Sequence, residues 1–425
     1  MLRPEAELAM IGPAARSRID RVVVLHDYSQ ALGGASYLVQ VLIAELRERD
    51  LAVTFFAGDD GGQFHRQDVE FIALGGKALL DRSPFGALTL GLHNPSVRRR
   101  LARWIARNDT PGTIYHLHGW SKILSPAVFA ALHAVADRLV LHGHDYFNGC
   151  PNGAFFDYRR EQDCTLRPLS RACLGCSCDK TSGAQKLWRV GREGLRRHWI
   201  GGAAQGARLL LIHPGQAPQF EQAGWPREKL VAVRNPVSPP CAERVAAQDN
   251  RGVLFIGRIS REKGADLAAR AAAEAGVPIT FVGEGAELEA IRAINPDARF
   301  AGRLDRAGVA RELARARIAV MPSRWSEPFG LVALEAIGSG VPVIVSQRAL
   351  VAREIAEKGL GLAVDTADPV AFAEAIRALH ADDERVRAMS LAGFEAYRTL
   401  CHSPGSWSDA VVDAYGVVLQ EAMPA

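Results

Sequence analysis

Short apolar runs alternate along most of the chain with longer segments in which apolar residues recur at helical spacing. Apolar runs that stop at glycine, proline or polar residues are typical of buried parallel strands, and the longer segments are typical of amphipathic helices that cover them. In the first half we expect strands at 21–25, 52–56, 69–74, 113–117, 138–141 and 209–212, and helices at 36–47, 97–107 and 186–199. In the second half we expect strands at 253–257, 279–282, 299–302 and 318–320, and helices at 265–275, 309–316, 331–337, 367–380, 382–391 and 407–419. This alternation predicts an α/β fold with doubly wound parallel sheets.

A chain of 425 residues is long enough for two or three domains. The stretch at 238–250 is polar and contains prolines, so it reads as a linker. We therefore expect a disordered tail at 1–18, a Rossmann-like domain at 19–237 with a cysteine-rich insert at 146–180, the linker at 238–250, a second Rossmann-like domain at 251–400 and a C-terminal helical segment at 401–425.

The composition is that of an ordinary globular protein, with 48% hydrophobic and 23% charged residues. A formal net charge of +4 is too small to indicate a nucleic-acid-binding surface, so we expect no nucleic-acid partner. Apolar stretches fall short of the roughly 18 residues of a membrane-spanning helix, and Glu5 and Glu7 argue against a secretion signal. We expect a cytoplasmic protein, with peripheral contact to the inner membrane face left open.

The stretch at 322–344 combines a strand end, a turn, a helix and the next strand. Glu327 lies in the turn and Glu335 inside the helix, with seven residues between them. The start of a helix offers free backbone N–H groups that suit a phosphate, here those of Phe329, Gly330 and Leu331. Both glutamates could then accept hydrogen bonds from hydroxyls beside a diphosphate. Two glutamates at a fixed gap are common, so their spacing alone would favour solvated side chains.

The residues around these glutamates resemble the donor-site motif of the retaining GT-B glycosyltransferases of family GT4. The pattern of that family is PS, E-x-F-G, L-E-A and G-x-P-V, and this sequence has Pro322–Ser323, Glu327–Gly330, Leu334–Ala336 and Gly340–Val343. A second family motif lies at Gly257–Gly264. The resemblance runs from about residue 22 to residue 365. It implies a GT-B fold, in which two Rossmann-like domains with doubly wound parallel sheets face each other across a cleft and the segment at 401–425 crosses back to the first domain.

The resemblance also implies roles for residues of the second domain. Arg258 and Lys263 would bind the donor diphosphate and stabilise the charge that develops on the leaving group. Glu335 would hold the ribose, and Glu327 would hold hydroxyls of the transferred sugar with the N–H groups named above. Because two cations would neutralise the diphosphate, no cofactor is expected to be required for catalysis.

Two stretches of the first domain complete the expected site. Gly33 and Gly34 follow the first strand and would line the cleft, although on their own they read equally well as a tight turn. His144 follows a strand at the sheet edge where α/β proteins bind ligands. The resemblance makes His144 the first candidate for a catalytic residue, with Asp145 orienting its ring or shaping the loop. Two weaker candidates are His118 and His142.

Five of the seven cysteines fall in the short segment at 150–178. Four thiolates at these spacings could hold a structural Zn²⁺ ion, and the most natural set is Cys150, Cys164, Cys173 and Cys176, with Cys178 as a substitute. Such an ion would fix a loop and would leave no open coordination position for catalysis. Free thiols and redox pairs remain alternatives.

Two of the expected helices are basic, at 97–107 and 186–199. The arginines of the first read as a solvated face or as contacts to anionic headgroups. The second carries a tryptophan–leucine face and an arginine face, so it could pack on the first domain or lie on a bilayer.

These features lead us to expect a retaining hexosyltransferase of the GT4 type. It would move a sugar from a nucleotide-diphosphate sugar to a hydroxyl of a glycan or lipid-linked acceptor, in polysaccharide biosynthesis. Two other classes stay open: a sugar-nucleotide epimerase of the same fold, and a non-catalytic sugar-nucleotide-binding or interaction protein. The glutamate spacing argues against the epimerase, and the intact set of two cations and two glutamates argues against lost catalysis.

Overall fold

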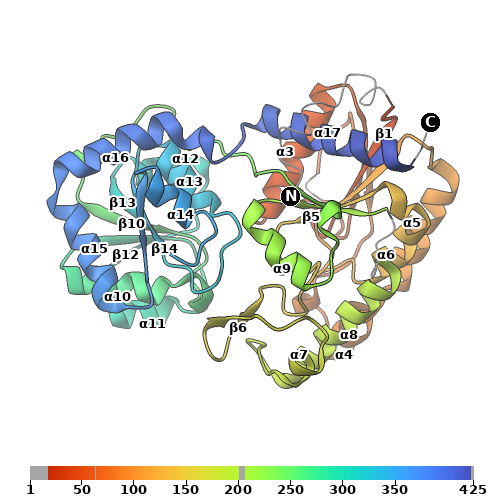
Figure 1. Cartoon of the computed structure of the whole chain (residues 1–425), viewed down its shortest axis with the longest axis horizontal. Coiled ribbons are helices and arrows are strands. Elements are labelled where there is room, and N and C mark those ends of the chain that lie inside the picture. Colours follow the sequence, from red (N-terminus) through yellow and green to blue (C-terminus); the bar gives the residue numbers. More distant parts are fainter. Residues whose placement is uncertain (1–17, 63, 201–205, 423–425) are drawn as a thin grey trace. The chain divides into compact units, whose positions relative to one another are not determined.

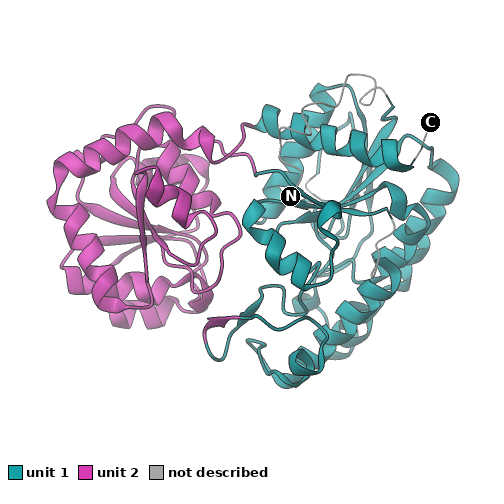
Figure 2. Cartoon of the chain, viewed as in Figure 1, with its two compact units in different colours: residues 1–160, 164–234, 404–425 teal, residues 161–163, 235–403 magenta. Residues whose placement is uncertain are grey.

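The computed structural model describes residues 18–62, 64–200 and 206–422. They divide into two compact units, which Figure 2 shows in different colours. Unit 1 comprises residues 1–160, 164–234 and 404–425, and unit 2 comprises residues 161–163 and 235–403. Apart from Arg18, the disordered tail expected at 1–18 lies outside the described residues.

Unit 1 is built on a seven-stranded parallel sheet with the strand order β3-β2-β1-β4-β5-β8-β9 (Figure 1). The strands are β1 (Arg21–His26), β2 (Ala52–Ala57), β3 (Glu70–Ala73), β4 (Thr113–Leu117), β5 (Leu139–Gly143), β8 (Arg208–Leu211) and β9 (Leu230–Ala232). Every residue of β4 and β5 is buried, as expected for central strands covered on both faces.

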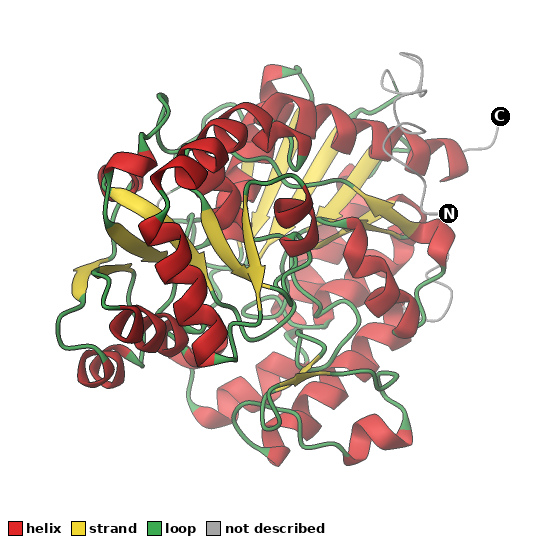
Figure 3. Ribbon diagram, turned by 60° about the vertical axis from the view of Figure 1, so that its left-hand side comes forward, coloured by secondary structure: helices red, strands yellow, loops and turns green. Residues whose placement is uncertain are grey.

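Helices pack against this sheet (Figure 3). They are α3 (Gly34–Glu48), η1 (Leu79–Asp81), α4 (Pro84–Leu92), α5 (Pro95–Asn108), α6 (Ala127–Leu132), η2 (His133–Arg138), η3 (Pro214–Gln216), α9 (Ala217–Gln222) and η4 (Arg227–Lys229). The expected insert at 146–180 contains β6 (Phe156–Asp157), β7 (Gln162–Asp163), whose residues group with unit 2, and α7 (Arg171–Gly175), and it is followed by α8 (Gly183–Ile200). Ser83 and Asn94 cap α4 and α5, because their side chains accept hydrogen bonds from first-turn N–H groups and a proline follows each.

The last helix, α17 (Pro404–Ala422), belongs to unit 1 although unit 2 precedes it in the chain. The hydroxyl of Tyr415 lies 2.6 Å from Nδ1 of His116 on β4. Arg49, at the end of α3, donates to Asp409 at 3.0 Å and to the carbonyl of Gly405 at 2.7 Å. The chain therefore closes unit 1 with its C-terminal helix.

The arginine face expected on α8 is turned inward. Arg196 donates to both carboxylate oxygens of Glu193 at 2.7 and 2.8 Å, and both side chains are buried. Arg192, also buried, donates to the carbonyl of Ser121 at 2.9 Å and lies over the ring of Trp120. The helix packs on unit 1, so these two arginines are not available to a bilayer.

Unit 2 is built on a six-stranded parallel sheet with the strand order β12-β11-β10-β13-β14-β15. The strands are β10 (Gly252–Ile256), β11 (Ile279–Val282), β12 (Arg299–Gly302), β13 (Ala316–Met321), β14 (Val343–Ser346) and β15 (Gly361–Val364). The helices are η5 (Ala247–Asp249), η6 (Arg261–Lys263), α10 (Ala265–Ala275), α11 (Leu288–Ile294), α12 (Arg306–Leu313), α13 (Leu331–Gly338), α14 (Ala352–Glu357), α15 (Pro369–Ala381), α16 (Asp383–Ala396) and η7 (Tyr397–Thr399).

The bounds predicted for the helix at 309–316 were wrong at both ends. Helix α12 begins at Arg306 because Asp305 caps it, accepting a hydrogen bond from the N–H of Gly308. It ends at Leu313, and Ala316 already starts β13. A run of alanines and arginines carries no helix stop signal, so the sequence did not reveal this boundary.

Each sheet reverses its strand order once. In unit 1 the reversal lies between β1 and β4, and in unit 2 between β10 and β13. Doubly wound sheets bind ligands where the order reverses, beyond the carboxyl ends of the strands. The loops after these four strands are therefore the first place to look for a site.

In the described part of the chain, no helix combines the length and apolar character required to cross a membrane.

Candidate active site

The reversal point of unit 2 brings together two residues expected to bind the donor. Lys263 follows β10 and Glu327 follows β13, and Lys263 Nζ donates to Glu327 Oε2 at 2.6 Å. The hydroxyl of Ser323 donates to the same oxygen at 3.1 Å. Lys263 also lies over the ring of Trp325. A cation and a carboxylate thus stand at the end of the sheet where a ligand is expected.

Two glycines allow these loops to approach each other. Gly264 has φ +70°, and a Cβ there would lie 2.0 Å from the carbonyl oxygen of Pro322 on the facing loop. Gly330 has φ +75° and precedes α13, which has no side-chain cap. The first N–H groups of α13 therefore point away from the helix without a capping side chain, which is the arrangement that binds phosphate.

Glu335 lies one turn inside α13 and is largely screened from water. Burial raises the pKa of its carboxyl to about 7, and the positive charge of Arg306 only partly opposes this shift. Close to neutral pH the group can therefore donate or accept a hydrogen bond. Both roles suit the hydroxyls of a sugar or ribose.

Arg258 does not join this group. Its side chain is 65% exposed, and its nearest charged partner is Glu262, at 3.7 Å. The structure therefore brings Lys263, Glu327 and the start of α13 together and leaves the guanidinium of Arg258 in solvent.

The residue that fixes the loop after β13, Arg324, was not predicted from the sequence. Arg324 donates to both carboxylate oxygens of Asp266, on α10, at 2.6 and 2.7 Å. Its backbone N–H donates to the carbonyl of Glu262 at 3.0 Å. A planar fork matched to a carboxylate is a rigid link. Arg324 and Asp266 are far apart in sequence, so no local pattern could have paired them.

At the reversal point of unit 1, Gly33 and Gly34 form the exposed start of α3. Gly33 is extended, and a Cβ on it would meet no atom within 4 Å. Neither the backbone nor the packing of unit 1 therefore requires glycine at position 33. The space beside it is open to a ligand.

Four histidines stack at the ends of β4 and β5. His116, His118 and His142 are buried, and His144 is partly exposed. Neighbouring rings lie 4.0 Å apart for His116 and His118 and 4.1 Å apart for His142 and His144. Burial lowers the pKa of His116, His118 and His144 well below the usual value, and the neighbouring imidazoles add to this. We therefore expect these rings to be neutral at pH 7.

His118, and not Asp145, contacts the ring of His144. Nδ1 of His118 and Nε2 of His144 are 2.9 Å apart, so one neutral ring donates a hydrogen bond to the other. Asp145 instead accepts a hydrogen bond from the N–H of Phe147 at 2.9 Å and shapes its own loop. Burial raises the pKa of Asp145 to about 6.

The loop after β4 is held by a carboxylate that sequence reasoning overlooked. Asp27 follows β1 and accepts hydrogen bonds from the N–H groups of Lys122, Ile123 and Leu124 at 2.8 to 2.9 Å. Its position directly after a strand could have indicated this role, but polar residues are also common in ordinary turns at such positions.

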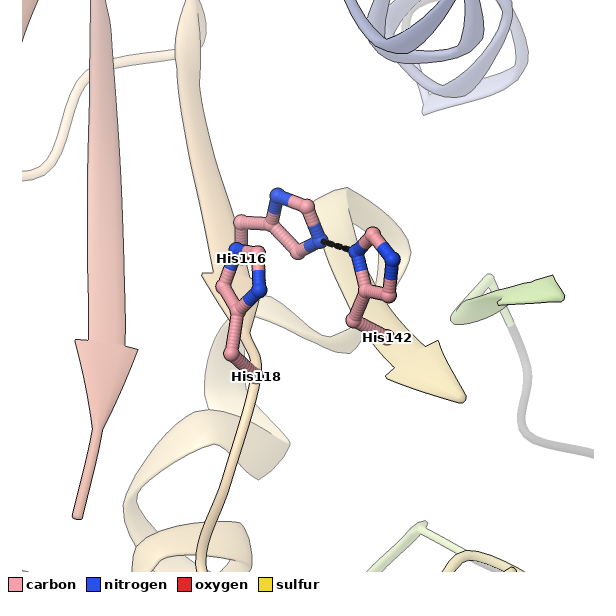
Figure 4. Close-up of side chains that lie close together, drawn as sticks. All are labelled: His116, His118 and His142. Atoms are coloured by element: carbon pink, nitrogen blue, oxygen red, sulfur yellow. Dashed lines mark hydrogen bonds between the residues drawn. The ribbon is translucent and has the colours of Figure 1, made fainter. Parts of the chain in front are cut away.

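Three of the stacked histidines could be considered for a metal ion. One nitrogen from each of His116, His118 and His142 lies within 4.8 Å of the others (Figure 4). Their rings, however, are nearly parallel, at 19° for His118 and His142 and 20° for His116 and His142. Because the nitrogen lone pair lies in the ring plane, these rings do not point at one position. His116 Nε2 and His142 Nδ1 also share a hydrogen bond at 3.1 Å.

The cysteines expected to bind zinc are all free thiols. Within the described ranges, the histidine triple is the one group of three or more His, Cys, Asp or Glu ligand atoms found at such short separation, so the four sulfurs are not gathered around one point. Instead, the buried ammonium of Lys186 donates to Cys178 Sγ at 3.0 Å and to Cys173 Sγ at 3.6 Å. A cation thus already lies beside two of the thiols. The structural zinc site stays an untested prediction.

Comparison with known proteins supports the resemblance drawn from the motifs. Residues 250–382 match the family model described as glycosyl transferases group 1. The glycogen synthase of Mycobacterium tuberculosis is 29% identical over 184 residues, which are 41% of this chain and 40% of that protein. The D-inositol 3-phosphate glycosyltransferase 1 of Catenulispora acidiphila is 31% identical over 238 residues, 50% of this chain and 54% of that protein. The chain thus spans about half the length of these curated relatives.

Solved structures confirm the fold over nearly the whole chain. A sucrose-phosphate synthase from Thermosynechococcus elongatus has a TM-score of 0.67 at 17% identity and covers 92% of this chain and 96% of its own. HepE from Anabaena, solved in complex with UDP, has a TM-score of 0.63 at 16% identity, with 93% and 99% covered. The two Rossmann-like units therefore form a GT-B fold.

Proposed function

We propose that the chain is a retaining, GT4-type glycosyltransferase, and its motifs, its match to group 1 glycosyl transferases over residues 250–382 and its GT-B fold support this. It would transfer a sugar from a nucleotide-diphosphate sugar to a hydroxyl of a glycan or lipid-linked acceptor in polysaccharide biosynthesis. The observation that carries this proposal is the Lys263–Glu327 pair beside the uncapped start of α13, at the reversal point of unit 2.

In this proposal the diphosphate binds at Lys263 and at the first N–H groups of α13. Lys263 has three N–H donors, so one can stay on Glu327 while the others reach phosphate oxygens. Arg258 is solvent-exposed and free to turn toward the same phosphates. Two cations and a helix N-terminus would then neutralise the diphosphate without a required cofactor.

During transfer, the bond between the anomeric carbon and the diphosphate oxygen breaks, and its electron pair stays on that oxygen. Lys263, Arg258 and the α13 N–H groups stabilise the resulting charge. The acceptor hydroxyl bonds to the anomeric carbon on the same face, and its proton passes to the leaving diphosphate. Glu327 and Glu335 accept hydrogen bonds from hydroxyls of the sugar and ribose. His144, held by His118, is the residue of unit 1 that we assign to the transferred sugar.

UDP-sugars are the first donors to test, because the similar HepE structure was solved in complex with UDP. The measurement is the release of nucleoside diphosphate from UDP-, GDP- and ADP-sugars. We expect release from one of these donors, and we expect it to be slow when water is the only acceptor. Lys263→Ala should reduce kcat/KM by roughly 10- to 100-fold, the loss expected for hydrogen bonds to a charged group. The matched control is Lys358→Ala, which removes an exposed lysine of the same unit. Absence of turnover with any donor would favour the non-catalytic binding protein.

A further inference from the structure

Large apolar side chains are exposed at one end of unit 1. Leu80 of η1 is 97% exposed, and Phe85 and Leu88 of α4 are 76% and 50% exposed. Leu187, near the start of α8, and Leu174 of α7 are 70% and 50% exposed. We call these five residues the apolar end. Elsewhere in the described ranges, the exposed large apolar residues are Leu32, Tyr37, Val370 and Leu391.

The elements that carry the apolar end are held together. The indole N–H of Trp188, on α8, donates to the carbonyl of Leu88 at 3.0 Å. Gly91 makes room for that indole, because a Cβ at position 91 would lie 2.5 Å from the Trp188 ring. The bond between Lys186 and Cys173 ties α7 to α8. Figure 1 shows α4, α7 and α8 at the same end of unit 1.

Helix α4 is unusually apolar for a helix of which so little is buried in unit 1. It reads PFGALTLGL, contains no charged residue, and buries Gly91 alone among its nine positions. A helix that is apolar on all sides is normally buried. Here Phe85 and Leu88 face outward and Leu90 and Leu92 are half-buried, so something outside unit 1 is expected to cover the two exposed side chains.

The charges around the apolar end indicate what covers it. The residues from 75 to 95 contain one acidic residue, Asp81, against the cations Lys77 and Arg82. Arg171, on α7, and Lys180, before α8, are exposed as well. A second copy of the same surface would bring these cations against each other. An anionic lipid surface would attract them and also accept the apolar side chains.

We propose that the apolar end inserts into the headgroup region of an anionic bilayer. In this account α4 and η1 supply the inserted side chains, and four cations around them, Lys77, Arg82, Arg171 and Lys180, lie on the headgroups. Arg192 and Arg196 of α8 take no part, because their side chains are buried. That the bilayer delivers a lipid-linked acceptor rests on the proposed function, whereas the binding itself does not.

The test is sedimentation of the purified chain with vesicles of phosphatidylcholine alone and with added phosphatidylglycerol. We expect binding to the anionic vesicles that weakens with salt, and little binding to the neutral ones. The double substitution Leu80→Ser and Phe85→Ser should raise the lipid concentration needed for half binding by at least about tenfold. Val370→Ser with Leu391→Ser, which removes two exposed apolar residues of unit 2, should leave it unchanged.

Three results would overturn the proposal. They are no binding to anionic vesicles at low salt, an equal loss in the unit 2 control, and a concentration-dependent dimer in sedimentation velocity that the Leu80/Phe85 variant abolishes. Thermal melting of both double variants checks that they fold. A thermal shift with a sugar nucleotide should be the same in all of them, so loss of membrane binding is distinguishable from failure of the proposed catalysis.

Discussion

At the scale of single residues, Glu335 is a carboxyl whose pKa the folded protein raises. Its pKa is raised to about 7 by burial, so between the unfolded pKa of 4.5 and pH 7 the folded chain holds a proton that the unfolded chain releases. Because the folded state then binds more protons, this group lowers stability as pH rises. A buried carboxyl tolerated at such a cost is typical of a binding site.

Glu335→Gln should therefore stabilise the chain at high pH. The gain expected in the free energy of unfolding is up to about 3 kcal/mol at pH 8, where the wild-type carboxylate is ionised, and less than about 1 kcal/mol at pH 5. Urea unfolding of both proteins at the two pH values measures it. An equal effect at pH 5 and pH 8 would contradict the raised pKa.

Other residues at the site were predictable only in part. Lys263, Glu327 and Glu335 could be named as candidates because each lies within a short motif after a strand. The pairing of Arg324 with Asp266 was not, since it joins two loops whose proximity is a product of the fold. Likewise, Asp145 was expected to orient the ring of His144 or to shape the loop, and it shapes the loop, whereas His118 contacts the ring.

At the scale of elements, the histidine stack makes the ends of β4 and β5 sensitive to acid. His116, His118 and His144 have pKa values well below the usual 6.5, and the groups facing them are His26, His142 and Tyr415. Below pH 6.5 the unfolded histidines take up protons that the folded ones refuse, so stability is lost as pH falls through that value.

The loss should be on the order of 1 kcal/mol per histidine for each pH unit below 6.5. We expect His118→Gln to flatten the slope of unfolding free energy against pH between 6.5 and 5. His65→Gln, which replaces an exposed histidine, should leave the slope unchanged. Equal slopes in wild type and His118→Gln would show that the stack is already protonated in the folded chain.

The attachment of α17 to unit 1 depends on a buried hydrogen bond. Tyr415→Phe removes the hydroxyl that bonds Nδ1 of His116 at 2.6 Å and leaves that nitrogen without this partner. The expected cost in unfolding free energy is about 1 to 3 kcal/mol. Tyr37→Phe, at an exposed tyrosine of α3, is the control and should cost close to nothing. Equal stability of the two variants in urea would refute a structural role for the Tyr415 hydroxyl.

Most of the elements were predictable because parallel strands and amphipathic helices have strong patterns. Strands β1, β2, β4 and β12 lie within a residue of the expected positions. The orientation of α8 was the chief uncertainty, because a helix with tryptophans and arginines reads the same whether its arginines face water or a buried glutamate. The pairing of Arg196 with buried Glu193 turns the arginines inward, and this pairing is visible only in the tertiary structure.

At the scale of the whole molecule, two units repeat one plan. Each is a parallel sheet whose order reverses once, and each carries candidate residues beyond the carboxyl ends of strands at or beside that reversal. Unit 2 holds the family match and the charged residues expected to bind a diphosphate. Unit 1 holds the histidine stack and the apolar end, and these features were the least predictable from sequence motifs.

The most direct test of this account is whether a sugar nucleotide binds at the reversal point of unit 2. The measurement is the melting temperature of wild type, Lys263→Ala, Glu335→Ala and Lys358→Ala against a panel of UDP-, GDP- and ADP-sugars. A ligand that binds the native state alone must raise the melting temperature. We predict a shift with one nucleotide, present in wild type and Lys358→Ala and lost in the other two. No shift with any donor, or a shift that survives in Lys263→Ala and Glu335→Ala, would contradict the assignment of the donor site.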